Sequence, residues 1–209
     1  MTFPLDLPEG ADLRELRLAE RFVQAVSENP FSLVEDVFDW PGQRWEAELV
    51  LRPLQRDGMA AWSVWFSKLG GRAGSFLLGD PLRSTPRGTP AGTPLIKTAG
   101  QTGTALVTDG WTPEAAGVLK ADDRIQIGAG LGARLHKVLE DVSADANGEA
   151  TLSLWPAIFF PHDADTPITT TNARGLFRLA QSSLDQVERR RAFHEDVRFR
   201  AYSVIASPV

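Results

Sequence analysis

The chain has 209 residues, enough to bury a substantial core as one large domain or two small ones. Hydrophobic residues make up 43% and charged residues 23%, which excludes wholesale disorder, and the net charge of −5 argues against a broad surface for nucleic acid. The absence of cysteine excludes disulfides and thiolate metal sites, and no segment approaches the roughly 18 apolar residues of a membrane span.

The N-terminal region is predicted to begin with an arm over residues 1–12, where Pro4 and Pro8 oppose regular structure. The first ten residues also lack the basic and apolar regions of a signal peptide. Residues 13–26 fit two patterns, a helical stripe and a partial strand alternation. The β-like sequence that follows favours a strand.

Residues 44–52 alternate clearly between apolar and charged side chains. Trp45, Ala47, Leu49 and Leu51 share one face, which is typical of a half-buried strand. Pro41-Gly42 just before them predicts a turn.

The apolar period then changes, predicting a helix over residues 57–69. Asp57 is placed to cap the start of this helix. Met59, Trp62, Phe66 and Leu69 form one stripe that Trp65 widens, and the helix is expected to end at Gly70-Gly71.

A short strand over residues 76–78 precedes a change of composition. Prolines and glycines alternate through residues 81–94, which predicts an extended connection. A domain boundary is therefore expected here.

Residues 95–160 read as an inserted β domain that packs as a semi-independent unit. Its predicted strands cover 104–108, 123–127, 135–142 and 149–154, and Asn147-Gly148 indicates a hairpin between the last two.

The C-terminal part is predicted to return to the first domain. Residues 175–181 and 197–205 have strand patterns, and 184–193 fit a loop or a short helix. The last strand is expected to lie in the same domain as residues 45–51, because each has one apolar face to bury.

Candidate catalytic and metal-binding groups are few. His162 lies beside Asp163 and Asp165, but in a proline-flanked loop without a second histidine, which favours a solvated loop over a metal site. His136 is expected on a sheet face, and His194 at a strand entrance. No nucleophile elbow, phosphate-binding loop or zinc motif is present, so we expect no catalytic, cofactor or metal site.

Two further groups are interpreted structurally. Asp122-Asp123 and the acids of 141–145 lack the spacing of a calcium loop and are expected to cap turns. Arg189, Arg190 and Arg191 lie among acidic residues, which favours a charged loop or a subunit salt-bridge surface over nucleic-acid binding. Trp62 and Trp65 exceed what one narrow stripe buries, which favours one of them facing a neighbouring subunit, with packing of both in the core as the alternative.

Three blocks of sequence together resemble the distal tail proteins of long-tailed, siphovirus-like bacteriophages. They are Asp39–Leu54, with its Trp-x-Gly-x-x-Trp start, residues 60–81, ending in Phe-Leu-Leu-Gly-Asp-Pro, and residues 117–158, with Leu119–Asp123 and the Asp-Ala-Asn-Gly hairpin. The chain departs from the family pattern at Asp122-Asp123, where Gly-Asp is expected.

The resemblance implies a mainly β fold: a β-sandwich ring domain with one α-helix, from residues 1–80 and 170–209, plus a small barrel-like inserted domain. It also implies a structural virion protein, assembled in the host cytoplasm into a ring, of six copies, that joins the tail tube protein to the tail hub or tip protein. Neither specific nucleic-acid binding nor membrane insertion is expected.

The alternative is a carbohydrate- or receptor-binding β module at the tail tip. An exposed Trp111 or Trp155 able to stack on sugar rings is the feature that would favour it.

Overall fold

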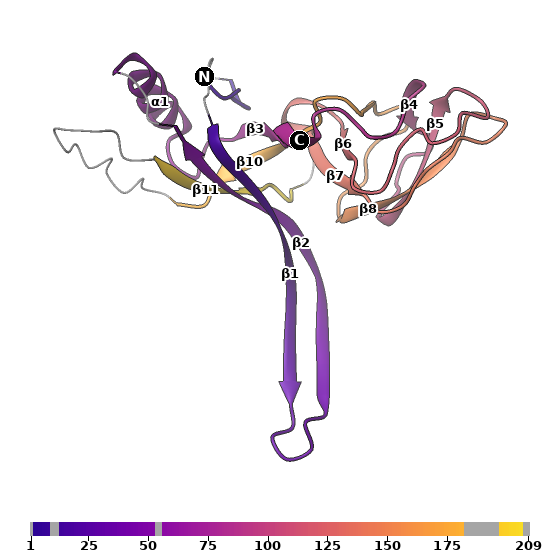
Figure 1. The fold of residues 1–209 in the computed structure, drawn as a ribbon, viewed down its shortest axis with the longest axis horizontal. Coiled ribbons are helices and arrows are strands. Elements are labelled where there is room, and N and C mark those ends of the chain that lie inside the picture. Colours follow the sequence, from indigo (N-terminus) through magenta and orange to yellow (C-terminus); the bar gives the residue numbers. More distant parts are fainter. Residues whose placement is uncertain (1, 9–12, 53–55, 182–196, 207–209) are drawn as a thin grey trace.

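The computed structural model describes residues 2–8, 13–52, 56–181 and 197–206. Within these ranges the fold is mainly β, with one α-helix, two short 3-10 helices and two sheets (Figure 1). A five-stranded sheet lies beside a six-stranded, barrel-like sheet, so the predicted fold class is confirmed.

The first sheet joins strands from both ends of the chain in the order β1-β2-β11-β10-β3. Its strands are β1 (Leu13–Glu28), β2 (Glu35–Leu51), β3 (Phe76–Gly79), β10 (Arg174–Leu179) and β11 (Arg198–Ser203). All neighbouring strands in this sheet are antiparallel, and Leu49 of β2 lies opposite Phe199 of β11. This pairing confirms that residues 45–51 and the last strand share one sheet, and that residues 13–26 form a strand.

Helix α1 (Arg56–Leu69) lies over one face of the first sheet. It begins one residue before the predicted start, and Gly70 and Gly71 follow it with positive φ, as a helix end of this type requires. The side chain of Asp57, predicted to cap the helix, lies outside the described set.

The first core forms between the helix and the inward side chains of the sheet. Its largest buried members are Trp45, Leu49, Leu51, Trp62, Trp65, Leu69, Phe76, Phe177 and Phe199. The predicted apolar face of residues 45–51 is therefore the buried face.

The second sheet has the strand order β4-β5-β8-β7-β6-β9. Its strands are β4 (Gly92–Ile96), β5 (Gly103–Trp111), β6 (Arg124–Ile127), β7 (Arg134–Val138), β8 (Ala150–Ile158) and β9 (Ile168–Thr169). Leu95 forms a bridge with Pro167, and Ile96 N–H donates to the Thr166 carbonyl at 3.0 Å. These contacts bring the two ends of the sheet together and nearly close a barrel around its own core.

The predicted limits of the inserted unit need correction. The second sheet runs from Gly92 to Thr169, beyond the predicted range of 95–160 at both ends. Residues 81–94 are not wholly an extended connection, because they include a 3-10 helix over Pro81–Arg83 and the start of β4. The backbone of Asn147-Gly148 does turn, but the preceding strand β7 ends at Val138 and not at residue 142.

The two sheets also share packing, which the prediction of a semi-independent unit did not anticipate. Leu135 and Trp155, from the second sheet, belong to the first core. Trp45 Nε1 donates to the Leu135 carbonyl at 2.9 Å, and Leu176 N–H donates to the Ala133 carbonyl at 3.0 Å. At Gly175 a Cβ would lie 2.7 Å from that of Leu135, so only glycine permits this approach of β10 to β7.

The N-terminal segment is docked and is not an arm. Leu5 forms a parallel bridge with Phe76, and its N–H donates to the Ser75 carbonyl at 2.9 Å. The Asp6 carbonyl accepts a hydrogen bond from Trp65 Nε1 at 2.7 Å. This segment thereby closes one side of the first core.

Candidate interaction site: the hairpin arm

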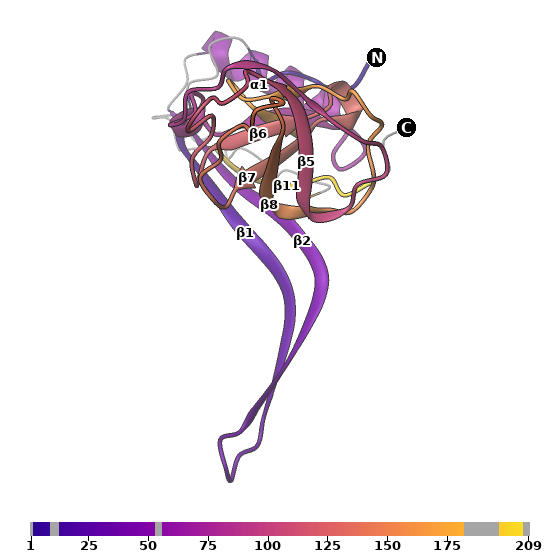
Figure 2. The ribbon, with the colours of Figure 1, turned by 90° about the vertical axis from the view of Figure 1, so that its right-hand side faces the viewer.

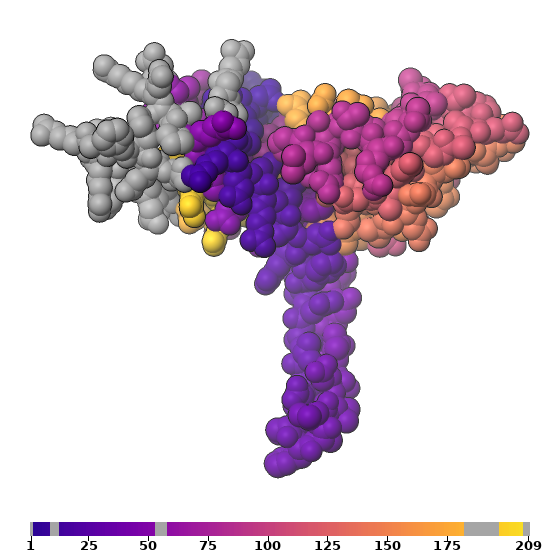
Figure 3. All heavy atoms as spheres, in the orientation of Figure 1, coloured from indigo at the N-terminus to yellow at the C-terminus, as the bar shows by residue number. Residues whose placement is uncertain are grey.

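The arm of this protein is a long β-hairpin made by the distal parts of β1 and β2. It projects from the body in both ribbon views and stands clear of it in the space-filling view (Figures 1, 2 and 3). We call residues 23–40 the hairpin arm. At about 3.3 Å per residue, its reach from base to tip is roughly 25 Å.

The hairpin turn is built by Asn29. Its Oδ1 accepts hydrogen bonds from the N–H groups of Phe31 and Ser32, at 2.9 and 3.3 Å. Leu33 has φ of 56°, and the Asn29 N–H donates to the Val34 carbonyl at 2.9 Å. An Asx-type turn of this kind reverses the chain between two strands.

A bulge marks the base of the arm. Phe22 pairs with Gln43, but Val23 pairs with Trp40, so Pro41 and Gly42 are extra residues on β2. The predicted turn at Pro41-Gly42 is therefore wrong, because the strand continues through it with a local irregularity. A Cβ on Gly42 would lie 2.7 Å from Val23 Cγ2, so a larger residue at this bulge would require the exposed Val23 side chain to shift.

The base of the arm packs against the second sheet. The Phe22 ring lies 5.5 Å from that of Trp155, and Gln43 Oε1 accepts a hydrogen bond from Ala157 N–H at 3.0 Å. Both contacts are made to β8 of the second sheet. The hairpin thus starts from a fixed base and becomes solvent-exposed beyond it.

The arm exposes large apolar side chains without burying any of them. Phe31 is 97% exposed, Leu33 70% and Trp40 50%. Phe38 and Val26 are also exposed. Contiguous exposed apolar groups of this kind mark interaction surfaces.

The pairing register divides the arm into two sides. Val23 faces Trp40 and Ala25 faces Phe38, which makes one side apolar and aromatic. The other side carries the pair Glu28–Glu35 next to the pair Val26–Val37. Residues 22–43 contain four carboxylates, from Glu28, Glu35, Asp36 and Asp39, and no lysine or arginine. The arm is therefore both apolar and acidic.

The predicted role of Trp62 and Trp65 in a subunit interface needs correction. Trp62 is 3% exposed and Trp65 5%, so neither offers its ring to a neighbouring subunit. The Trp65 ring lies 5.2 Å from Trp62 and 5.0 Å from Phe76, edge-on in both cases. The docked N-terminal segment covers the Trp65 side of the helix, which the sequence analysis had expected a neighbouring subunit to cover. Arg189, Arg190 and Arg191 lie outside the described residues.

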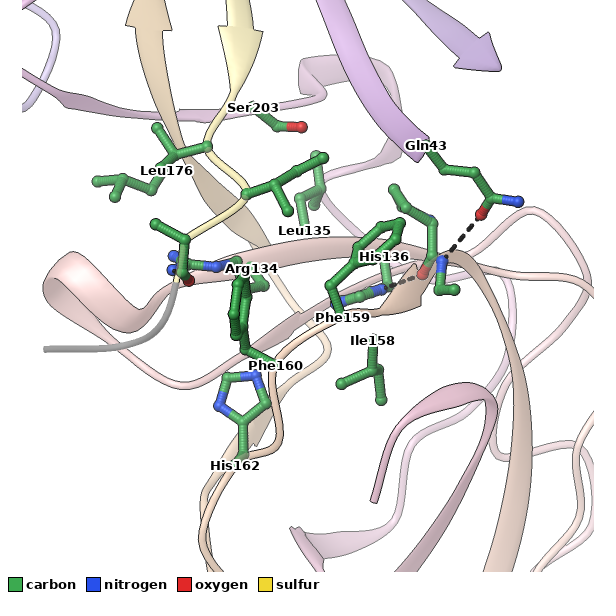
Figure 4. A pocket seen from close by; sticks show the side chains of 15 residues that line it. Gln43, Arg134, Leu135, His136, Ile158, Phe159, Phe160, His162, Leu176 and Ser203 are labelled. Carbon is green, nitrogen blue, oxygen red and sulfur yellow. Dashed lines mark hydrogen bonds between the residues drawn. The ribbon is translucent and has the colours of Figure 1, made fainter. Parts of the chain in front are cut away.

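His136 and His162 line a small pocket between the sheets (Figure 4). Burial lowers the pKa of His136 to about 4, and its Nδ1 donates to the Pro156 carbonyl at 2.8 Å. Burial also lowers the pKa of His162. The pocket holds about 50 Å³, far less than the several hundred Å³ of ordinary ligand sites. It is a packing feature with room for only a few water molecules.

Among the described residues, no group of three or more histidine and carboxylate side chains is placed to hold a metal ion. The His162 loop brings no such set together. His194 lies outside the described residues.

The Asp122-Asp123 pair has the structural role that the sequence suggested. Asp123 is buried and accepts hydrogen bonds from the N–H groups of Arg87, Gly88 and Lys120 at 2.7 to 3.1 Å. Asp122 has φ of 75°, a conformation that favours glycine, and binds Arg83 and Arg124 at 2.6 and 2.9 Å. Glycine would adopt this backbone conformation without strain.

The tryptophans considered for sugar stacking are buried. Trp111 and Trp155 are at most 5% exposed, so the carbohydrate-binding alternative lacks the feature on which it depended. The arm, in contrast, was missed by the sequence interpretation. The signal was present in Asn29-Pro30, a turn dipeptide between two apolar runs.

In the part of the chain that the structure describes, no helix has the length and apolar character needed to cross a bilayer. No protein-family model and no curated protein matches this sequence.

Proposed function

We propose that this chain is a structural protein of a phage tail tip or baseplate, similar to the distal tail proteins. It assembles with copies of itself into a ring, of six subunits, that joins the tail tube protein to the tail hub. It is assembled in the host cytoplasm and resides in the virion. We assign it no catalytic centre and no cofactor.

The observation that carries the proposal is the hairpin arm. Its aromatic and aliphatic side chains bury nothing within the chain, and a free subunit gains no stability from exposing them. Burial against a neighbour removes this surface from water and contributes about 25 cal/mol for each Å² of apolar area.

The arrangement of the fold supports the same function. A mainly β body with one helix and an inserted barrel-like sheet is the layout that the resemblance implies. An arm and a body are different surfaces, so contact between them is heterologous, and heterologous contacts generate rings when the rotation closes.

Native mass spectrometry of the purified chain, with and without residues 24–39, tests the proposal. We expect the full chain to form a closed oligomer of six subunits, and the shortened chain to remain monomeric. A full chain that stays monomeric alone and with its tail neighbours would contradict the proposal.

A further inference from the structure

The outward face of the first sheet carries a cluster of arginines on the side opposite helix α1. We call this cluster the arginine face; its members are Arg17, Arg21, Arg44, Arg178 and Arg200. Cross-strand pairing places Glu48 between Arg17 and Arg200, and Arg21 beside Arg44. Arg198 and Glu15 lie on the same face, opposite Val50, so that six cations face the three anions Glu15, Glu46 and Glu48, an excess of three positive charges on an acidic protein.

The arginine face is hollowed. A shallow groove of about 380 Å³ lies over it, lined by Arg17, Arg44, Arg200 and Tyr202 among others. The guanidinium of Arg44 lies 4.6 Å from the centre of the Tyr202 ring. The groove therefore combines positive charge with flat stacking surfaces.

Several of these cations have unused binding capacity. Among the described residues, Arg17 and Arg21 have no ion-pair partner, whereas Arg44 pairs with Glu46 at 2.8 Å. Arg200 approaches Glu48 only to 3.8 Å. Guanidinium groups bind carboxylates and stack on aromatic rings, so the face suits a partner that supplies both.

The hairpin arm supplies both. It has four carboxylates and no cation over residues 22–43, and the exposed rings of Phe38 and Trp40 share their side with Asp36, while the other three carboxylates lie on the opposite side. An arm does not reach the arginine face of its own chain, because β1 and β2 build that face and then extend away from it (Figures 1 and 2). The complementary partner is thus the arm of another copy.

We propose that the hairpin arm of one subunit docks on the arginine face of the next. This inference rests on the proposed function, since it names the two surfaces that meet in the ring. The contact is head-to-tail, and every subunit gives one arm and receives one.

Charge reversal on each surface tests this contact in the full-length chain. The arm variant is Glu35→Lys/Asp36→Lys/Asp39→Lys, and the face variant is Arg21→Glu/Arg200→Glu. We expect each variant alone to self-associate at least about tenfold more weakly than the unaltered chain. An equimolar mixture is expected to recover association, because reversed arms then meet reversed faces and unaltered arms meet unaltered faces.

Matched controls use exposed charges in the loops that adjoin the second sheet. Glu140→Lys and Lys120→Glu lie away from both surfaces and are expected to leave association unchanged. The neutral pair Arg21→Gln/Arg200→Gln, expected to weaken association to a smaller degree, covers the case in which charge reversal prevents folding. Circular dichroism verifies the fold of each variant.

The outcomes separate this inference from the proposed function. If the unaltered chain forms rings and the reversed variants do so equally well, the arm docks elsewhere, and this contact is overturned while the ring stands. Variants that weaken association but are not rescued by mixing also overturn it. If arm variants assemble normally while face variants lose binding to a short oligonucleotide, the arginine face binds nucleic acid and the proposed contact is overturned. A monomeric unaltered chain overturns both proposals.

Discussion

At the scale of single residues, buried polar groups in this protein hold particular turns and joints. Asp123 bonds three backbone N–H groups, and His136 bonds the Pro156 carbonyl between the two sheets. The neighbouring charges at His136 are His162 and Arg134, and both oppose its protonation. His136 therefore stays neutral in the folded chain, with its proton on Nδ1.

This state makes stability depend on pH. The folded pKa of His136 is about 4, below its ordinary value of 6.5, so the unfolded chain binds more protons between these values. The stabilising contribution is present above pH 6.5 and is lost as pH falls toward 4. We expect a loss of about 2 kcal/mol in the free energy of unfolding between about pH 7.5 and 5.

Urea unfolding of the unaltered chain and of His136→Gln, at both pH values, measures this loss. The variant lacks the titrating group and is expected to show a smaller decrease between the same two pH values. Equal pH dependence in the two proteins would show that His136 does not titrate in this way.

At the scale of elements, the hairpin arm adds surface without adding to the core. No side chain of residues 23–40 belongs to either core, and the strands leave the body at a bulge. The arm is thus expected to be separable from the stability of the fold.

Shortening the arm tests this separation. Val23 and Trp40 are directly paired, so replacing residues 24–39 with Asn-Gly gives a two-residue hairpin loop. We expect the thermal midpoint to change by at most about 5 °C, because no buried group is lost. A large fall in the midpoint, measured by circular dichroism, would show that the arm helps to fold the body.

The sequence predicted most helices and strands, but it predicted neither the hairpin arm nor the burial of both helix tryptophans. Apolar and charged side chains alternate over residues 44–52 because one face of that strand is buried and the other is exposed to solvent. This alternation can be read from the segment alone. Both faces of the arm are exposed to solvent, so its apolar residues, Val23, Val26, Val37 and Phe38, do not follow the alternation of a half-buried strand. Trp65 donates its indole N–H to the distant Asp6 carbonyl, and Leu5 packs against the same core, which a helical stripe does not reveal.

At the scale of the whole molecule, the two sheets are coupled through one tryptophan. Trp45 packs edge-on against Trp155 at 4.5 Å, stacks beneath Arg124 at 5.1 Å and donates its indole N–H to Leu135. All three partners lie in the second sheet. The insertion therefore completes the first core as well as forming its own.

Removing the second sheet is expected to weaken the remaining domain. Gly79 pairs with Arg174, so a two-residue turn in place of residues 80–173 is compatible with the register. The remnant leaves the Trp45 N–H without an acceptor, and we expect it to bind a hydrophobic dye and to melt earlier than the full chain.

Trp45→Phe provides the matched comparison for this excision. In the full chain it is expected to destabilise the fold by roughly 1–3 kcal/mol, since it leaves the Leu135 carbonyl unpaired. In the remnant the same substitution is expected to cost less, because no bond remains to be lost. Equal effects in both backgrounds would show that the sheets are energetically independent.

The hairpin also exposes a hazard of the unassembled subunit. Within the described ranges, each strand of the arm has a neighbour on one side only beyond the base, so two open edges run along an aromatic surface. Such edges invite strand-to-strand aggregation between copies. With four carboxylates and no cation, arms repel one another, and Pro41 removes one edge N–H donor at the base. Replacing these acids with neutral residues is therefore expected to make the unassembled protein aggregate and precipitate. Low pH, which protonates the same carboxylates, is expected to have the same effect.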